Sequence, residues 1–198
     1  MLSRHGLLVG LLAGACTVPT HATTVPLAAD GGWNRFDVSE LDATSFGVEW
    51  INNADSLSPD FGTPLAFSFT VAAGMQATLT IVDAGFAGDT FTLTNFGAAF
   101  GSTSAVPAGA YESAIDVGTD FNAALADAHF SRAVLTLGAG DYRIGGALAQ
   151  SVTFEGLPLN ATVGALSLSV SPVPEPTSLA IFGAGLGMLG LFLRRRRG

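Results

Sequence analysis

The 198-residue chain carries sixteen acidic residues against eight basic ones, all of them arginine, and its formal net charge is −8. This balance excludes binding to nucleic acid by phosphate neutralisation, which depends on clustered lysine and arginine. One cysteine is too few for a disulfide framework, and of the three histidines only His129 lies beyond the first 22 residues, too few for a zinc site of histidine and cysteine in the rest of the chain.

The first 22 residues have the order of a secretory signal peptide. Arg4 provides a positive start, residues 7–15 are apolar, and Thr20-His21-Ala22 fits a cleavage site. Cleavage after Ala15 is an alternative, and Cys16, which follows three small residues, leaves a lipoprotein signal open. We therefore expect export through the inner membrane and a mature chain without cysteine if cleavage follows Ala22.

Strand patterns dominate residues 23–170. Residues 65–71, 77–81 and 91–93 alternate apolar and small polar side chains, which is the two-residue period of a half-buried strand. Further strands are expected at residues 46–51, 133–137, 142–146, 151–154 and 166–170. Glycines mark breaks between several of these segments, as expected where the chain turns.

One segment, residues 120–127, predicts a short helix. Asp120 or Thr119 is a suitable N-cap, and Phe121 and Leu125 would face the core at a spacing of four residues. Many short strands with one small helix predict an all-β fold, an antiparallel β-sandwich or jelly roll.

Carboxylates are the only abundant reactive groups of the domain. Residues 23–176 contain three arginines against all sixteen acids, a formal charge of −13. Loop-like acids that could bind calcium, which prefers six to eight oxygen ligands, are Asn52–Asp55 with Asp60 and Asp83 with Asp89. We expect no resident cofactor, with calcium as the alternative.

The residue inventory argues against an enzyme. Once the leader is removed His129 is the only histidine, and no G-x-S-x-G motif accompanies it. Paired carboxylates would permit glycoside cleavage, but sixteen acids with few bases are typical of a solvated surface. Four aromatic residues could stack on sugars or belong to the core: Trp33, Trp50, Tyr111 and Tyr142.

The C-terminal 28 residues form an ordered series of segments. Residues 171–177 are a proline-rich spacer containing Val173, Pro174, Glu175 and Pro176, and residues 178–193 carry no charge. As a helix these sixteen residues span about 24 Å, close to the lower limit for crossing the ~30 Å hydrocarbon core. Arg194, Arg195, Arg196 and Arg197 follow and favour a cytoplasmic end, residues 194–198. A buried core helix is the alternative.

This series resembles the PEP-CTERM sorting signal of Gram-negative bacteria, in the Pro174-Glu175-Pro176 motif, the apolar segment and the arginine block. The resemblance implies recognition by an exosortase, an integral-membrane cysteine transpeptidase, which removes the helix and passes the protein to the cell surface or an exopolysaccharide matrix. Residues 82–91 and 126–142 also resemble ectodomains attached to such tails.

The sequence therefore predicts an exported, non-enzymatic surface or matrix protein that passes through a single-pass membrane intermediate. Its expected partners are an exosortase-type enzyme, the inner membrane and exopolysaccharide, and not nucleic acid. The alternatives are a carbohydrate- or calcium-binding module of the matrix and a glycan-active enzyme that uses the abundant carboxylates.

Overall fold

The computed structural model describes residues 22–173. The expected signal peptide and membrane segment lie outside the described residues, apart from Ala22. Among residues 22–173, no helix is long and apolar enough to cross a bilayer.

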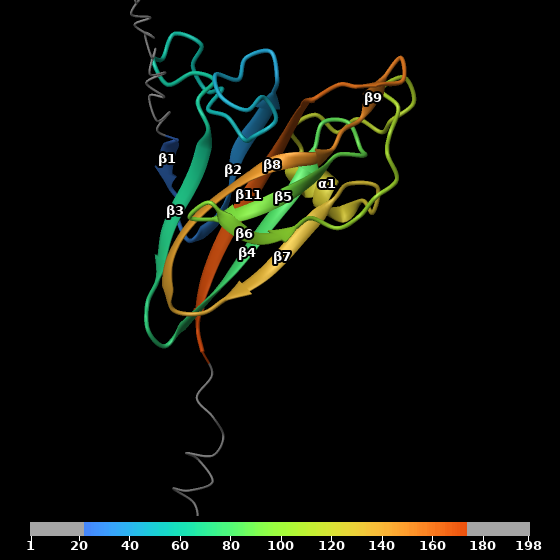
Figure 1. Ribbon diagram of the computed structural model, residues 1–198. Helices are drawn as coiled ribbons and strands as arrows, with labels where there is room; N and C mark the ends of the chain where they lie inside the picture. Colours follow the sequence, from blue (N-terminus) through green and yellow to red (C-terminus); the bar gives the residue numbers. More distant parts are fainter. Residues whose placement is uncertain (1–21, 174–198) are drawn as a thin grey trace, which may run out of the picture.

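The described chain is mostly β-strand with a single short helix (Figure 1). The elements are β1 (Thr23–Pro26), β2 (Asp30–Ser39), β3 (Leu65–Val71), β4 (Met75–Ala84), β5 (Thr90–Asn95), β6 (Ala98–Ser102), α1 (Phe121–Ala126), β7 (Arg132–Leu137), β8 (Gly140–Gln150), β9 (Thr153–Phe154), β10 (Leu157–Pro158) and β11 (Ala161–Pro172).

The strands form two larger sheets and a small hairpin. One sheet has the order β1-β3-β8-β5-β6, the other has the order β2-β11-β4-β7, and β9 pairs with β10. Every pairing is antiparallel except that of β1 with β3. The prediction of an antiparallel β fold with one short helix is therefore confirmed at this level.

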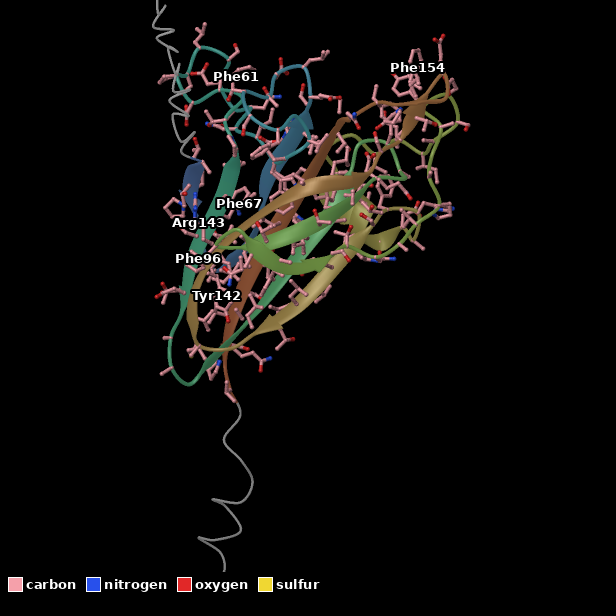
Figure 2. The ribbon with its side chains drawn as sticks, in the orientation of Figure 1. Phe61, Phe67, Phe96, Tyr142, Arg143 and Phe154 are labelled. Carbon is pink, nitrogen blue, oxygen red and sulfur yellow. The ribbon has the colours of Figure 1, made fainter. Side chains whose placement is uncertain are left out.

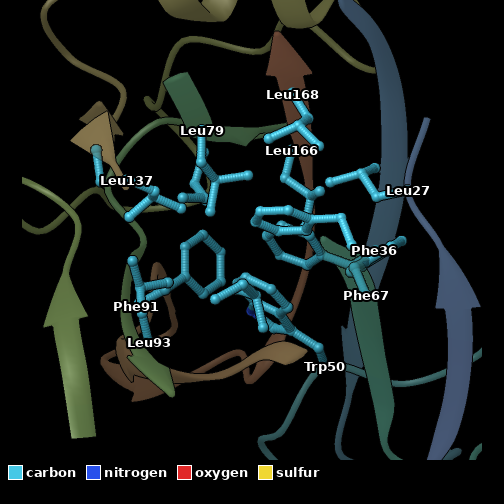
Figure 3. Close-up of a cluster of buried hydrophobic side chains, with 14 of the residues drawn as sticks. Leu27, Phe36, Trp50, Phe67, Leu79, Phe91, Leu93, Leu137, Leu166 and Leu168 are labelled. Atoms are coloured by element: carbon cyan, nitrogen blue, oxygen red, sulfur yellow. The ribbon is translucent and has the colours of Figure 1, made fainter. Parts of the chain in front are cut away.

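The two larger sheets share one hydrophobic core. Inward-facing side chains of both sheets are fully or almost fully buried in it (Figure 3): Phe36, Leu79 and Leu166 from one sheet, and Phe67, Phe91 and Leu93 from the other. Burial of such side chains contributes roughly 1.5–3 kcal/mol each, so this cluster is the main source of stability. A smaller cluster, which includes Ala124 and Phe130, attaches α1 to the end of β4.

Most strand predictions are confirmed, because alternation is visible wherever a strand buries one face. The expected strand at 65–71 coincides with β3, and those at 77–81, 91–93 and 166–170 lie inside longer strands. The helix prediction is also confirmed, and Asp120 is the N-cap: its carboxylate accepts a hydrogen bond from the Ala123 N–H at 3.0 Å.

The strand predicted at residues 46–51 is wrong. Only isolated bridges involve Glu49 and Ile51. The Glu49 carboxylate accepts a hydrogen bond from the Phe46 N–H at 2.6 Å, which folds the segment into a bend. The segment instead delivers Trp50 into the core, where it is fully buried.

The register fixes which connections share an end of the domain. Val71 pairs with Gly140, Ala77 with Leu137 and Met75 with Pro172, so the β3–β4 and β7–β8 turns lie beside the end of β11. We call this the tail end, at the bottom of Figure 1. The long connections after β2, β4, β6 and β8 lie at the opposite end, the loop end, where Figure 2 places Phe61 and Phe154.

Candidate functional site

The last strand continues to the start of the expected sorting motif. Ser171 and Pro172 pair with Gln76 and Met75, and the Val173 N–H donates to the Gly74 carbonyl at 2.9 Å. The folded domain therefore takes up the first residues of the predicted spacer. Val173 is 46% exposed, and Pro174, Glu175, Pro176 and the arginine block lie outside the described residues.

A pair of buried carboxyl groups lies at the loop end. Asp83 stands near the end of β4 and Asp89 just before β5, and residues 85–88 form the loop that leads from β4 to Asp89. Asp83 is 0% exposed and Asp89 is 1% exposed. Neither Asp83 carboxyl oxygen has a hydrogen-bond partner, whereas Asp89 accepts from the Val152 N–H at 2.7 Å. Buried carboxyl groups without a partner are costly when they are ionised.

Burial changes the protonation of this pair. Desolvation, followed by repulsion from Asp89, raises the pKa of Asp83 to about 9. The N–H groups of Ala84, Gly88 and Asp89 partly offset this rise, although none completes a hydrogen bond to the carboxyl group. Burial also raises the pKa of Asp89 to about 6, against the lowering effect of Thr162 and Val152. At neutral pH the pair therefore holds one proton and one negative charge.

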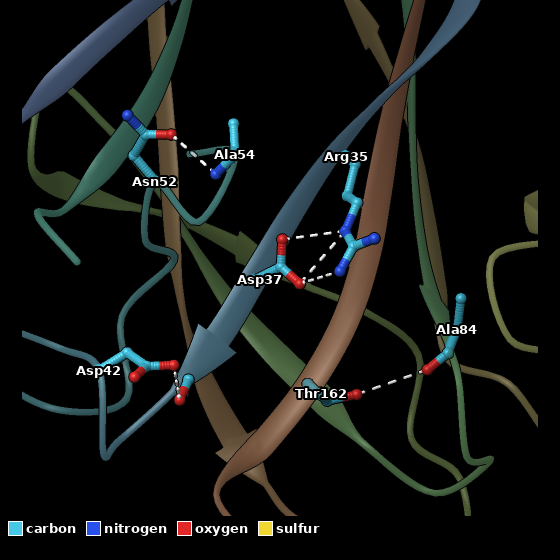
Figure 4. Close-up of polar contacts among 8 residues, drawn as sticks. Arg35, Asp37, Asp42, Asn52, Ala54, Ala84 and Thr162 are labelled. Carbon is cyan, nitrogen blue, oxygen red and sulfur yellow. Dashed lines mark hydrogen bonds and ion pairs between the residues drawn. The ribbon is translucent and has the colours of Figure 1, made fainter. Parts of the chain in front are cut away.

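The second group of acids proposed for calcium is arranged differently. Asn52 turns its amide nitrogen, not its oxygen, toward Asp60 and donates to Oδ2 at 2.7 Å. The hydroxyls of Ser58 and Thr23 also donate to Asp60, and these donors lower its pKa. The Asn52 oxygen accepts from the Ala54 N–H, as Figure 4 shows. These oxygens are thus engaged by protein donors in a hydrogen-bonded loop.

Within residues 22–173, no three groups from histidine, cysteine, aspartate and glutamate come close enough to hold a metal ion. Of the two acid groups that the sequence suggested for calcium, Asp83 and Asp89 are close enough to repel each other. A calcium ion bound there would have to take its further ligands from backbone or hydroxyl oxygens.

The buried carboxylate Asp37 has a cation beside it. The Arg35 side chain, two residues earlier on β2, donates to both Asp37 oxygens, and the shortest N–O distance is 2.5 Å (Figure 4). The ion pair and its hydrogen bonds raise the pKa of Arg35. This arrangement neutralises Asp37 and is structural.

His129 has an acidic partner but no nucleophile. Its ring Nδ1 lies 2.6 Å from an oxygen of Asp127, and its side chain is 66% exposed. A pocket of about 310 Å³ is lined by both His129 and Ser113. The Ser113 hydroxyl, however, donates to the Ala110 carbonyl at 3.5 Å, and no hydrogen bond links it to the His129 ring. The backbone N–H of Asp127 caps α1, and its carboxylate also accepts a hydrogen bond from the His129 backbone N–H at 2.9 Å, so the pair holds the turn that follows the helix.

The four aromatic residues considered for sugar stacking separate into different environments. Trp50 is 0% exposed, and Tyr142 stacks on Phe69 with ring centroids 5.1 Å apart. Trp33 donates its indole N–H to Asn122. Tyr111 remains 41% exposed at the loop end. It contacts two further aromatic rings there, those of Phe86 and Phe154.

The sequence did not indicate the Tyr111 cluster as a unit. Phe86 and Tyr111 lie in two separate connections and Phe154 lies on β9, and they meet only in the folded domain, with centroid separations of 4.5 Å and 5.6 Å. Phe154 is 44% exposed and the neighbouring Leu157 is 71% exposed. Together they form an apolar surface at the loop end.

Comparison with known proteins gives one family match. The model described as the PEP-CTERM protein-sorting motif matches residues 172–197, which include every residue predicted for the motif and the arginine block. The resemblance seen in the sequence is thus confirmed for these residues. No curated protein matches the chain.

Among solved structures, the 1.0 Å crystal structure of the pre-peptidase C-terminal domain of a collagenase from Bacillus anthracis matches at 11% sequence identity and a TM-score of 0.32. The match covers 78% of this chain and 98% of that one.

Proposed function

Because residues 172–197 carry a PEP-CTERM protein-sorting motif, the signal of an exported protein sorted by an exosortase-type membrane enzyme, we propose that this chain is a non-enzymatic protein of the cell surface or of an exopolysaccharide matrix. In this proposal the apolar segment holds the chain in the inner membrane as a single-pass intermediate. The enzyme then removes that segment and releases the domain.

The observation that carries the proposal is the position of the motif relative to the fold. The last strand of the described residues ends at Pro172, the Val173 N–H makes a backbone hydrogen bond to the Gly74 carbonyl, and the Pro-Glu-Pro motif begins at the next residue. Cutting the chain after the motif would remove none of the strands found within residues 22–173. A processed domain would keep the whole of β11, whose ten pairings with β4 link the two halves of its sheet.

The inventory of side chains supports a non-enzymatic role. Residues 22–173 offer one histidine and no cysteine, and the histidine is paired with Asp127 on the surface. The paired carboxyl groups Asp83 and Asp89 are buried, so a polysaccharide cannot reach them as it reaches the two acids of a glycosidase cleft.

The test replaces the motif in the native host. A variant with Pro174→Ala, Glu175→Ala and Pro176→Ala should remain in the membrane fraction, whereas the wild type should appear in the medium or matrix. Ser171→Ala, an exposed substitution within β11, is the matched control and should behave as the wild type. Release of the triple variant at the wild-type rate would contradict sorting through the motif.

A second candidate function is calcium binding, favoured by the unpartnered and buried carboxyl group of Asp83 beside Asp89. A calcium ion would supply the positive charge that this pair lacks, with the remaining oxygen ligands coming from the surrounding loop. Isothermal titration of the domain with calcium should give heat that Asp83→Asn and Asp89→Asn both remove and that Asp55→Asn retains. A flat titration of the wild-type domain would eliminate this candidate.

Carbohydrate binding by the same domain would use the exposed Tyr111 and Phe154 rings, because Trp50 and Tyr142 are engaged in packing. Retention on immobilised exopolysaccharide from the host should be lost in Tyr111→Ala and kept in Trp33→Ala, whose ring is held by Asn122 and Phe121. Equal retention of both variants would exclude Tyr111 as a contact.

A further inference from the structure

The two ends of the domain differ in charge. Of the fifteen acidic residues within 22–173, twelve lie in the loop-end connections or, in the case of Asp83, near the loop end of a strand. They are Glu40, Asp42, Glu49, Asp55, Asp60, Asp83, Asp89, Glu112, Asp116, Asp120, Asp127 and Glu155. The remaining three are Asp30, Asp37 and Asp141.

The turns at the tail end carry no charge and no large side chain. Residues 72–74 read Ala-Ala-Gly, and residues 138–139 read Gly-Ala. All of these residues are exposed. The nearest acid, Asp141, accepts a hydrogen bond from the Thr70 hydroxyl at 2.7 Å. The two turns are therefore uncharged, and only Asp141 and Asp30 lie near them on a strongly acidic domain.

The length of the chain that follows Val173 limits how the domain can lie relative to a membrane. Four residues, 174–177, separate Val173 from Ser178, where the apolar segment begins. Fully extended, the five residue steps from Val173 to Ser178 reach at most about 18 Å. Strand β4 alone has ten residues and spans about 30 Å between the two ends. The tether is thus too short for the domain to turn over and place its loop end on the same surface.

Electrostatics favours the same orientation. The Debye length at physiological ionic strength is about 8 Å, so acids about 30 Å from the surface are screened from anionic lipid headgroups. The reverse orientation would turn the nine loop-end acids that are not buried toward those headgroups. Only two acids, Asp30 and Asp141, lie toward the end that the tether holds near the membrane.

From these two observations we infer that the tail end, residues 72–74 and 138–139, lies against the lipid headgroup surface while the chain is held by its tail, and that the acidic loop end faces away. This inference rests on the membrane-held stage of the proposed function. It adds a specific partner surface for the domain and places the Tyr111 cluster and the Asp83–Asp89 pair on the side that faces the matrix.

The test uses the full chain in vesicles of phosphatidylcholine with one-fifth phosphatidylglycerol, a fraction of whose headgroups carry a nitroxide quencher. Cys16 is the only cysteine, so a Cys16→Ala background allows single fluorescent labels at Ala73→Cys, Ala139→Cys and, as the matched loop-end control, Ala54→Cys. All three positions are exposed, and thermal unfolding checks that each variant folds.

Labels at positions 73 and 139 should be quenched at least threefold more than the label at position 54. Insertion of twelve glycine and serine residues after Val173 should reduce that difference. Equal quenching at all three positions, in protein that floats with the vesicles, would overturn the inference but leave the anchor intact. Failure to float would instead overturn the membrane-held stage, and the inference with it. Protection of positions 73 and 139 only when the processing enzyme is present would assign this surface to the enzyme rather than to lipid.

Discussion

Phe36 and Trp50 stack face to face between the two sheets, with ring centroids 3.8 Å apart and an angle of 15° between the ring planes. A glycine lies beyond each ring: Gly164 on β11 beneath Phe36, and Gly146 on β8 beside Trp50. Phe91 meets both rings edge-on. The centre of the core is therefore a stack of two aromatic rings. The stack fits because the residue that each ring touches on a neighbouring strand is a glycine, which has no side chain.

Adding a methyl group at either glycine should destabilise the domain. A Cβ at Gly164 would lie 2.3 Å from the Phe36 ring, and one at Gly146 would lie 2.5 Å from the Trp50 ring. Overpacking of this kind costs about 1–3 kcal/mol. We expect Gly164→Ala and Gly146→Ala each to lower the free energy of unfolding by that amount in urea titrations.

The matched control for these variants is Gly101→Ala on β6. No heavy atom lies within 4 Å of the Cβ position there, so the change should alter stability by less than about 0.5 kcal/mol. A similar loss at all three glycines would mean that the aromatic stack is not the cause.

The Asp83–Asp89 pair predicts an unusual dependence of stability on pH. The pKa of Asp83 is raised to about 9 and that of Asp89 to about 6, so the folded state keeps protons that the unfolded chain has already lost above its ordinary carboxyl pKa near 4. The contribution of these protons to the free energy of unfolding is fully present below about pH 4. It falls as the pH rises, up to about pH 6 for Asp89 and up to about pH 9 for Asp83. Each proton lowers the free energy of unfolding by at most about 1.4 kcal/mol per pH unit.

Urea unfolding of the domain in chelator should therefore show declining stability between pH 5 and pH 8. Asp83→Asn, which is neutral throughout, should flatten the decline, whereas Glu155→Gln at an exposed position should not. Stability that rises over this interval in the wild-type domain would contradict the buried, protonated state of the pair.

The helix cap gives a local prediction. The Asp120 carboxylate accepts the hydrogen bond from Ala123, while Thr119 contributes only its backbone carbonyl, to the Phe121 N–H. Asp120→Ala should lower the free energy of unfolding by about 1 kcal/mol. Thr119→Ala should be close to neutral. The reverse order in thermal unfolding would assign the cap to Thr119.

The sequence was informative where a local pattern determines the structure. Residues 65–71 alternate cleanly and form β3, and Asp120 begins the one helix. The sequence does not predict strand β2, because its only buried apolar residues are Phe36 and Val38. The rest of the strand includes two glycines and the Arg35–Asp37 ion pair, which hide the alternation. The parallel pairing of β1 with β3 depends on contacts about forty residues apart, which no local pattern records.

In the candidate site, too, features set by neighbouring residues could be predicted and features set by distant residues could not. The sorting motif could be predicted because its parts are consecutive in the chain. Asp83 and Asp89 were also grouped from the sequence, but acids are mostly exposed, so their complete burial was not foreseen. Trp50 could not be assigned to the core or to a sugar surface beforehand, because its environment depends on two glycines about 95 and 115 residues further along the chain.

The most direct test of the account is the intact mass of the protein recovered from outside the native host's cells. We predict a chain that begins at Thr23, contains the whole of β11 and has lost the apolar segment and the arginines that follow it, Ser178–Gly198. An extracellular protein that retains Ser178–Gly198 would contradict processing at the tail.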